Sequence, residues 1–345
     1  MKKEMKQIER KQNRVPVFIF VALLVTVLVV VLILAVRKGG VSVSGADAAQ
    51  MEGTETAGEE KWQEGVVSYN GSQYRYNTAI KTYLFLGVDK PGPVKPAEDG
   101  ISGGQSDAMF LLVRDDAAKK LSIIAIHRNT MTAVDVYDSE GNFVRQEEHQ
   151  ICLQHGYGDG MRTSCLRSVD AVSRLFYNLP VNGYLSLRMD GVPALNDAVG
   201  GVTVEVLEDL KDESRGVDLK KGETVTLTGD EAYVYLRARD TDEFDSASGR
   251  LLRQQQYLTA FLTQAKSTAS EEVVKALDEE ISDYMVTNID FVELVTETQG
   301  YTYDASGMYR VPGEVSMGPV YEEYHVDDTA LYEMILDIFY ESVDG

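Results

Sequence analysis

The sequence predicts an α/β domain that is exported and held at a membrane by one N-terminal helix. Residues 15–36 form an uncharged run of 22 residues, long enough to cross a bilayer core as a helix. Short apolar runs bounded by turn residues begin at Thr82 and predict buried strands. Segments with apolar residues at helical spacing then alternate with further strands, which is typical of an α/β arrangement.

The first 77 residues predict an anchor followed by a linker. Six basic residues against two acidic ones precede the apolar run, so the positive-inside rule leaves residues 1–14 in the cytoplasm. The run exceeds the roughly 7 to 15 residues of a signal-peptide core. We therefore expect an uncleaved, single-pass helix at 15–36 in the cell membrane. Residues 37–77 are rich in Gly, Ser, Ala, Thr and Glu and predict an extracytoplasmic linker.

The exported part is strongly acidic. Residues 39–345 hold 25 basic and 53 acidic side chains, a formal net charge of −28. Such a surface repels nucleic acid and anionic lipid headgroups, so any basic cluster within it should be a local pocket. Two cysteines, Cys152 and Cys165, could form one disulfide in an oxidising compartment, and a reducing one would leave them as thiols.

Three apolar runs open the folded part. The last two flank a polar turn and predict an antiparallel hairpin. If the first pair is antiparallel as well, Asp89, Asp107 and Arg128 fall on one edge of the sheet. The three runs are 82–88, 108–113 and 121–126.

Helices and strands alternate after these runs. Thr228 and Glu231 have the spacing of a capping box and predict a helix running toward Leu236. The clearest helix is 250–266, because its apolar residues fall on one stripe. The other expected elements are helix 164–178, strand 184–189, helix 192–199, strand 202–206, a helix from about 271, a polar turn-rich section at 300–319 and helix 329–340.

The segment 235–256 concentrates basic side chains within this acidic domain. Arginine forks bind phosphate oxygens, and a pair of carboxylates can hold Mg²⁺ that shares those oxygens. Each residue also has an ordinary alternative as a turn, cap or solvated side chain. The candidate site consists of Asp89, Asp107, Arg128, Arg237, Arg239, Arg250 and Arg253.

Six short motifs in this order resemble the LytR-CpsA-Psr family. They are GVD (87–89), SD (106–107), HRNT (127–130), DAVGGVTVEV (197–206), LTGDEAYVYLRAR (227–239) and GRLLRQQQ (249–256). The resemblance implies a phosphotransferase of Gram-positive envelopes. Such enzymes attach teichoic acid, capsule or another wall polysaccharide from a polyprenyl-pyrophosphate carrier to peptidoglycan.

The resemblance also implies a fold and roles for single residues. The expected fold is an α/β/α sandwich around a mixed central sheet, with an apolar tunnel for the lipid. Residues 78–268 would form the catalytic domain, and 269–345 an extension packed on it. Asp89 and Asp107 match metal-binding aspartates for Mg²⁺ or another divalent cation, and Arg128 matches a catalytic arginine. The expected pyrophosphate-binding residues are Arg237, Arg239, Arg250, Arg253 and Gln254.

Four positions depart from the family pattern. Pro91 and Gln105 stand where the family has arginines, Asn129 replaces an aspartate, and Asp240 replaces a histidine. We expect a divergent but active enzyme with weaker pyrophosphate binding, and Asp240 or Asp245 as candidate bases. The alternatives are a non-catalytic scaffold or regulator that binds lipid-linked polymer, and a prenyl-pyrophosphate phosphatase.

Overall fold

The computed structural model describes residues 65–268, 280–290, 293–294, 297–298, 300–303 and 307–343. The cytoplasmic segment 1–14 and the transmembrane helix 15–36, both predicted from the sequence, lie outside these residues. Within the described ranges, no helix is both long enough and apolar enough to cross a bilayer.

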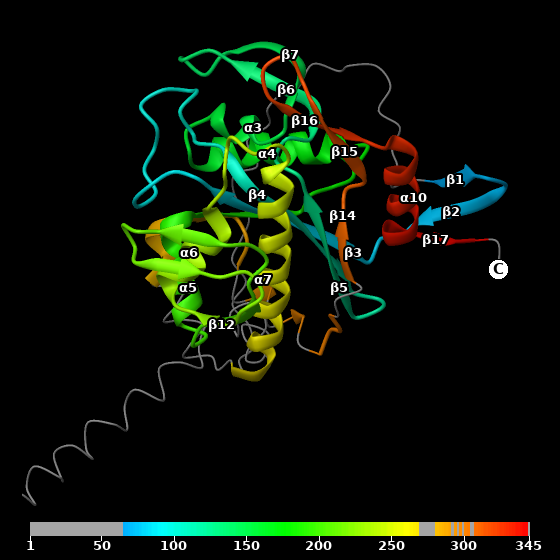
Figure 1. Cartoon of the computed structure of the whole chain (residues 1–345). Helices are drawn as coiled ribbons and strands as arrows, with labels where there is room; N and C mark the ends of the chain where they lie inside the picture. The colour runs from blue at the N-terminus through cyan, green and yellow to red at the C-terminus, as the bar shows by residue number, and fades with distance from the viewer. Residues whose placement is uncertain are drawn as a thin grey trace, which may run out of the picture.

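A six-stranded mixed sheet forms the centre of the fold (Figure 1). Strands β3, β4 and β5 make an antiparallel meander, while β8 runs parallel to β3 and β14 parallel to β5. The predicted mixed α/β class with a central mixed sheet is therefore confirmed. In sheet order the strands are β13 (Met285–Thr287), β8 (Gly183–Arg188), β3 (Ile80–Val88), β4 (Ser106–Asp115), β5 (Lys120–Ile126) and β14 (Met308–Arg310).

Helices cover both faces of this sheet because successive strand side chains alternate between the faces. Leu84 and Leu86 belong to a core that also contains buried residues of α4 (Arg162–Leu175) and α10 (Asp328–Phe339). On the opposite face, Phe85 and Phe110 pack toward three further helices. These are α5 (Val192–Asp197), α6 (Gly229–Arg237) and α7 (Ser246–Thr268).

The helices that carry the arginines have ends fixed by local sequence. Thr228 and Glu231 form the predicted capping box at the start of α6. This helix ends at Arg237, and Ala238 is already extended. Helix α7 starts at Ser246, four residues before the predicted start, directly after Asp245 with its positive φ of 61°.

Several strands have no counterpart in the predicted elements. One of them, β7, reads FVRQEEHQ and is too polar to show the alternation that marks a half-buried strand. They form through backbone pairing within hairpins. These are β1 (Val66–Tyr69) with β2 (Ser72–Tyr76), β6 (Met131–Tyr137) with β7 (Phe143–Gln150), β10 (Leu210–Asp212) with β11 (Val217–Leu219), and β15 (Gly313–Met317) with β16 (Glu322–Val326).

Both ends of the described chain are built into the fold. The β1–β2 hairpin lies within 37–77, the segment expected to be a linker, and β2 pairs with β17 (Tyr340–Ser342). Regular structure thus begins earlier than the sequence predicted. Strands β13 and β14, which come from the C-terminal part, complete the central sheet. In addition, β12 (Thr224–Leu227) pairs with β9 (Val202–Glu205).

Candidate functional site

The three residues predicted to share one sheet edge do meet there. Asp89 follows β3, Asp107 is the second residue of β4, and Arg128 follows β5. The antiparallel meander brings these strand ends together. Asp107 Oδ1 lies 2.8 Å from Arg128 Nε.

Asp107 also binds the first turns of α7. Its Oδ2 accepts a hydrogen bond of 2.8 Å from Arg250 Nη1. One carboxylate thus holds two guanidinium groups, and all three side chains are at most 14% exposed. Burial lowers the pKa of Arg250, and the Asp107 charge opposes this effect. Burial also acts to lower the pKa of Arg128, but negative neighbours including Asp107 outweigh it and the pKa is raised.

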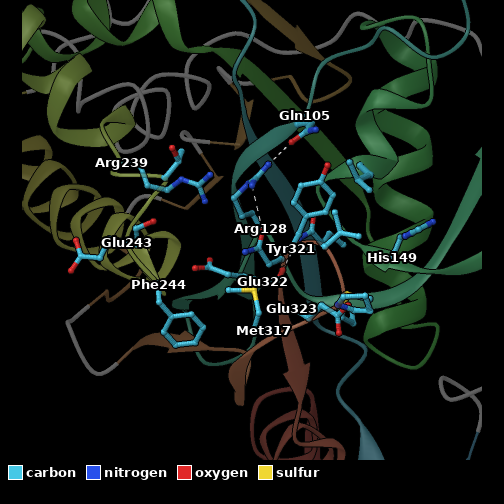
Figure 2. Close-up of a pocket in the computed structure, with 18 of the residues that line it drawn as sticks. Gln105, Arg128, His149, Arg239, Glu243, Phe244, Met317, Tyr321, Glu322 and Glu323 are labelled. Carbon is cyan, nitrogen blue, oxygen red and sulfur yellow. Dashed lines mark hydrogen bonds between the residues drawn. The ribbon is translucent and has the colours of Figure 1, made fainter.

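A second, more exposed ion pair lies at the same edge. Arg237, the last residue of α6, donates to Asp89 from Nε at 2.9 Å and from Nη2 at 3.4 Å. The hydrogen bond to Asp89 raises the pKa of Arg237. Arg239 lines the same polar pocket as Arg128, and Figure 2 shows the two side chains next to each other there.

Arg253 and Gln254 face the backbone of α6. Arg253 is 1% exposed and donates from Nε to the Tyr235 carbonyl oxygen at 2.7 Å. It also bonds the Ala238 carbonyl and pairs with Glu208. Gln254 Nε2 donates to the Leu236 carbonyl at 3.1 Å, and its Oε1 has no hydrogen-bond partner among the described residues. The two side chains therefore hold the segment that carries the Arg237 and Arg239 pair.

Two of the four departures from the family pattern contact Arg128. The Arg128 guanidinium donates to Gln105 Oε1, and its Nη1 donates to Asn129 Oδ1 at 3.4 Å. Both neutral amides thus orient the arginine without neutralising its charge. Lys90 is directed away, since its Nζ donates to the Ser102 carbonyl at 2.6 Å.

His127 supports the turn that carries Arg128. Its Nδ1 accepts a hydrogen bond of 3.2 Å from the Asn129 N–H, and its ring stacks on Tyr324 with centroids 4.7 Å apart. Burial first, and then the charge of Arg310 and other arginines, lower the pKa of His127 to about 3. The imidazole is therefore neutral at physiological pH.

An apolar cavity of about 190 Å³ adjoins the cluster on one side. It lies between the sheet and helices α5, α6 and α7. Its lining includes Gly87, Ala108 and Leu236, which are close neighbours in sequence of Asp89, Asp107 and Arg237. Gln254 also lines it.

A larger polar pocket of about 710 Å³ also adjoins the cluster and shares no lining residue with the apolar cavity. Gln105, Arg128 and Asn129 form part of its wall (Figure 2). Much of the rest comes from segment 241–246 and from the β15–β16 hairpin, including Tyr321 and Glu322, and strands β6 and β7 also contribute. Sequence reasoning missed the hairpin residues, because 300–319 was read only as polar and turn-rich and no element was predicted between 319 and 329.

Asp89 and Asp107 supply only part of the ligand set that a metal ion requires. Within the described ranges, no group of three or more His, Cys, Asp or Glu side chains could hold a metal ion. Asp89 and Asp107 provide two carboxylates, and Mg²⁺ is commonly held by one or two of these together with substrate phosphates and water. The donor set therefore fits Mg²⁺ provided that phosphate oxygens complete its shell.

The cysteines are not bridged. Cys152 and Cys165 are both free and buried. Burial raises the pKa of Cys152 to about 11 and that of Cys165 to about 12, so both are neutral thiols at physiological pH. Of the two states left open by the sequence, the structure has the thiols.

The sequence matches the LytR_cpsA_psr family over residues 40–335. It is 26% identical over 250 residues to the polyisoprenyl-teichoic acid--peptidoglycan teichoic acid transferase TagV of Bacillus subtilis, covering 70% of this chain and 60% of that protein. The chain thus spans about 60% of the length of this curated relative.

Solved structures share the fold. Protein gbs0355 of Streptococcus agalactiae superposes with a TM-score of 0.61 at 20% identity, covering 76% of this chain and 87% of that one. TagT bound to LIIa-WTA superposes with a TM-score of 0.55 at 20% identity, covering 76% of this chain and 90% of that one.

Proposed function

The chain belongs to the LytR_cpsA_psr family, and on that premise we propose that it is a glycopolymer phosphotransferase. Its donor is a glycopolymer on a polyprenyl-pyrophosphate carrier, and its acceptor is peptidoglycan. The observation that carries the proposal is the cluster of Asp89, Asp107 and their arginines at the junction of an apolar cavity and a polar pocket. A lipid-linked pyrophosphate has this division into an apolar tail, a charged linkage and a polar glycan.

The apolar cavity supports binding of the carrier. Almost all of its lining is aliphatic or aromatic, as a prenyl chain requires. Its volume of about 190 Å³ accommodates a segment of such a chain rather than its whole length. The prenyl segment next to the pyrophosphate would lie here, beside Gly87 and Ala108.

The arginines support binding of the pyrophosphate. Arg128 and Arg250 are desolvated and held by one carboxylate, so their positions are fixed before substrate arrives. Arg237 and Arg239 are more accessible and extend the positive surface. Arg250 Nη2 is buried without a hydrogen-bond partner among the described residues, which leaves a donor for a substrate oxygen.

In the proposed reaction, an acceptor hydroxyl attacks the phosphorus that bears the glycan. A new oxygen–phosphorus bond forms, and the bond from that phosphorus to the bridging oxygen breaks. Polyprenyl monophosphate leaves with the bond's electron pair, and the acceptor proton passes to a base or to the leaving phosphate. Arg128 stabilises charge on the transferred phosphoryl group, because phosphoryl transfer depends mainly on positioning and neutralisation.

We propose that Asp89 and Asp107 hold Mg²⁺ together with the pyrophosphate. When bound, the ion would neutralise phosphate oxygens during transfer. We also propose that residues 15–36 anchor the protein in the cell membrane with residues 1–14 in the cytoplasm. An extracytoplasmic active site is where both the carrier and the wall acceptor are accessible.

The test uses the full-length protein in detergent with a lipid-pyrophosphate glycan, Mg²⁺ and peptidoglycan. Labelled glycan should become covalently attached to peptidoglycan as polyprenyl monophosphate is released. Arg128→Ala should abolish attachment, because the transferred phosphate loses its buried cation.

Two results would contradict the transferase proposal. Release of glycan phosphate without attachment would indicate hydrolysis. Donor binding without turnover in the wild type would indicate a scaffold. Arg145→Ala is a matched control, because Arg145 is exposed and its ion-pair partner among the described residues is Glu147 on strand β7.

A further inference from the structure

The wall of the polar pocket opposite Arg239 is a hairpin with no assigned role. Strand β16 docks on the turn that carries Arg128, since the Tyr324 N–H donates to the Asn129 carbonyl at 2.9 Å. Gln150 Nε2 donates to the Glu322 carbonyl at 2.7 Å, which ties the hairpin to β7. The hairpin is therefore held in a fixed position beside the catalytic arginine.

The tip of this hairpin is also closed. The Gly318 N–H donates to the Tyr321 carbonyl at 2.9 Å. Glu322 Oε1 accepts a hydrogen bond of 2.7 Å from the Asp245 N–H, just ahead of α7. The tip thus contacts the start of the helix that carries Arg250.

Large apolar side chains gather at this pocket without being buried. Tyr321 is 70% exposed, Val320 71%, Met317 63% and Phe244 55%. These are four of the eleven exposed large hydrophobic residues of the described chain, and all four line the one pocket. Exposed apolar side chains concentrated beside a polar site mark a binding surface.

The direction of attack decides which substrate part this pocket faces. In phosphoryl transfer the attacking and leaving oxygens are roughly in line through phosphorus. The leaving polyprenyl phosphate belongs to the apolar cavity. The attacking hydroxyl therefore approaches from another direction, and the polar pocket, which Arg128 lines and which shares no lining residue with the cavity, is the opening that serves it.

We infer that the β15–β16 hairpin and residues 241–246 form the acceptor subsite, in which a sugar ring of the acceptor strand stacks on Tyr321. This inference rests on the proposed transferase function. Aromatic side chains present a large rigid face to a sugar ring at low entropic cost. Figure 2 shows Tyr321 and Arg239 flanking Arg128, so a ring on Tyr321 lies next to the reacting phosphate.

The charges of the pocket narrow the class of acceptor. Asp242, Glu243, Glu322 and Glu323 line it together with Arg128 and Arg239. Carboxylates accept hydrogen bonds from sugar hydroxyl and amino groups and repel anions. We therefore expect an uncharged or amino sugar strand to bind, and a strand densely substituted with anionic groups to be excluded.

The experiment measures acceptor and donor parameters separately for Tyr321→Ala in the full-length protein. The KM for peptidoglycan glycan strands should rise at least about tenfold, as for loss of a central aromatic contact. The KM for the donor should stay within about twofold. Tyr321→Phe should retain most acceptor affinity, since it keeps the stacking face.

Phe143→Ala is the matched control, because Phe143 is 59% exposed on the neighbouring hairpin and does not line the pocket. An unchanged acceptor KM in Tyr321→Ala would overturn the inference. So would a change confined to the donor KM, which would place the donor glycan on the hairpin.

Direct binding separates this inference from the proposed function. Fluorescent glycan strands are titrated into the protein without donor, and Tyr321→Ala should weaken their binding at least about tenfold. If the wild type transfers nothing yet shows this loss, the subsite stands and the transferase proposal fails. If the wild type transfers glycan but Tyr321→Ala binds strands as well as the wild type, the subsite inference fails.

Discussion

Replacing Arg253 by methionine separates two roles for this residue. The sequence predicts a pyrophosphate ligand, whereas the structure directs its guanidinium to the carbonyl oxygens of Tyr235 and Ala238 and to Glu208. Carbonyls at a helix C-terminus lack intrahelical partners and carry partial negative charge, so a cation stabilises them. Methionine fills a similar volume but donates no hydrogen bond.

The expected magnitude follows from the two carbonyl contacts. A hydrogen bond to a charged group contributes about 1.5 to 3 kcal/mol. At the lower value, losing both reduces the free energy of unfolding by about 3 kcal/mol. For a domain of this size that corresponds to a fall in Tm of roughly 6 to 12 °C. Burial lowers the pKa of Arg253 to about 10, so the residue remains charged at neutral pH.

The assay combines denaturant unfolding with donor binding. Arg253→Met should lower the free energy of unfolding by this amount. Donor affinity should fall only to the extent that the segment carrying Arg237 and Arg239 becomes less ordered. Arg215→Met is a matched control, because Arg215 also contacts α6 but its partner Asp230 is 55% exposed. We expect the free energy of unfolding of Arg215→Met to differ from that of the wild type by less than about 1 kcal/mol. Unchanged stability with lost donor binding in Arg253→Met would refute this reasoning.

Three further predictions follow from the site. Asp107→Asn leaves Arg128 and Arg250 buried without their shared anion, so transfer should fall at least about 100-fold and the free energy of unfolding by about 3 kcal/mol. A single-turnover rate of Asp107→Asn equal to that of the wild type would contradict this. Ala108→Leu fills part of the apolar cavity, so polyprenyl donor affinity should fall at least about tenfold while glycan-strand binding is retained. Equal donor affinity of Ala108→Leu and the wild type in a lipid-binding assay would contradict it. Finally, burial and then Arg310 lower the pKa of His127 to about 3, so the unfolded chain binds a proton near pH 5 that the folded protein does not. Between pH 7 and 5, wild type should lose about 2 kcal/mol more stability than His127→Gln in denaturation curves, and equal losses would refute this.

The sequence was sufficient for the elements whose physics is local. The buried strands β3, β4 and β5 are continuous apolar runs, and the capping box at Thr228 and Glu231 starts α6 as predicted. Such signals depend on neighbouring residues alone. The same reasoning placed Asp107 and Arg128 at one edge, because antiparallel order fixes which strand ends meet.

Tertiary structure decided what depends on distant partners. The sequence could not show that Asp107 holds both Arg128 and Arg250, or that Arg253, three residues after Arg250, faces a different set of groups. Residues on one helix face different environments according to the elements packed around them. Apolar residues alternate in β15 and β16, at Val315 and Met317 and at Tyr324 and Val326, but the place of this hairpin beside Arg128 comes from backbone pairing with Asn129. Composition and spacing therefore determined the kind of site, and packing determined which side chains form it.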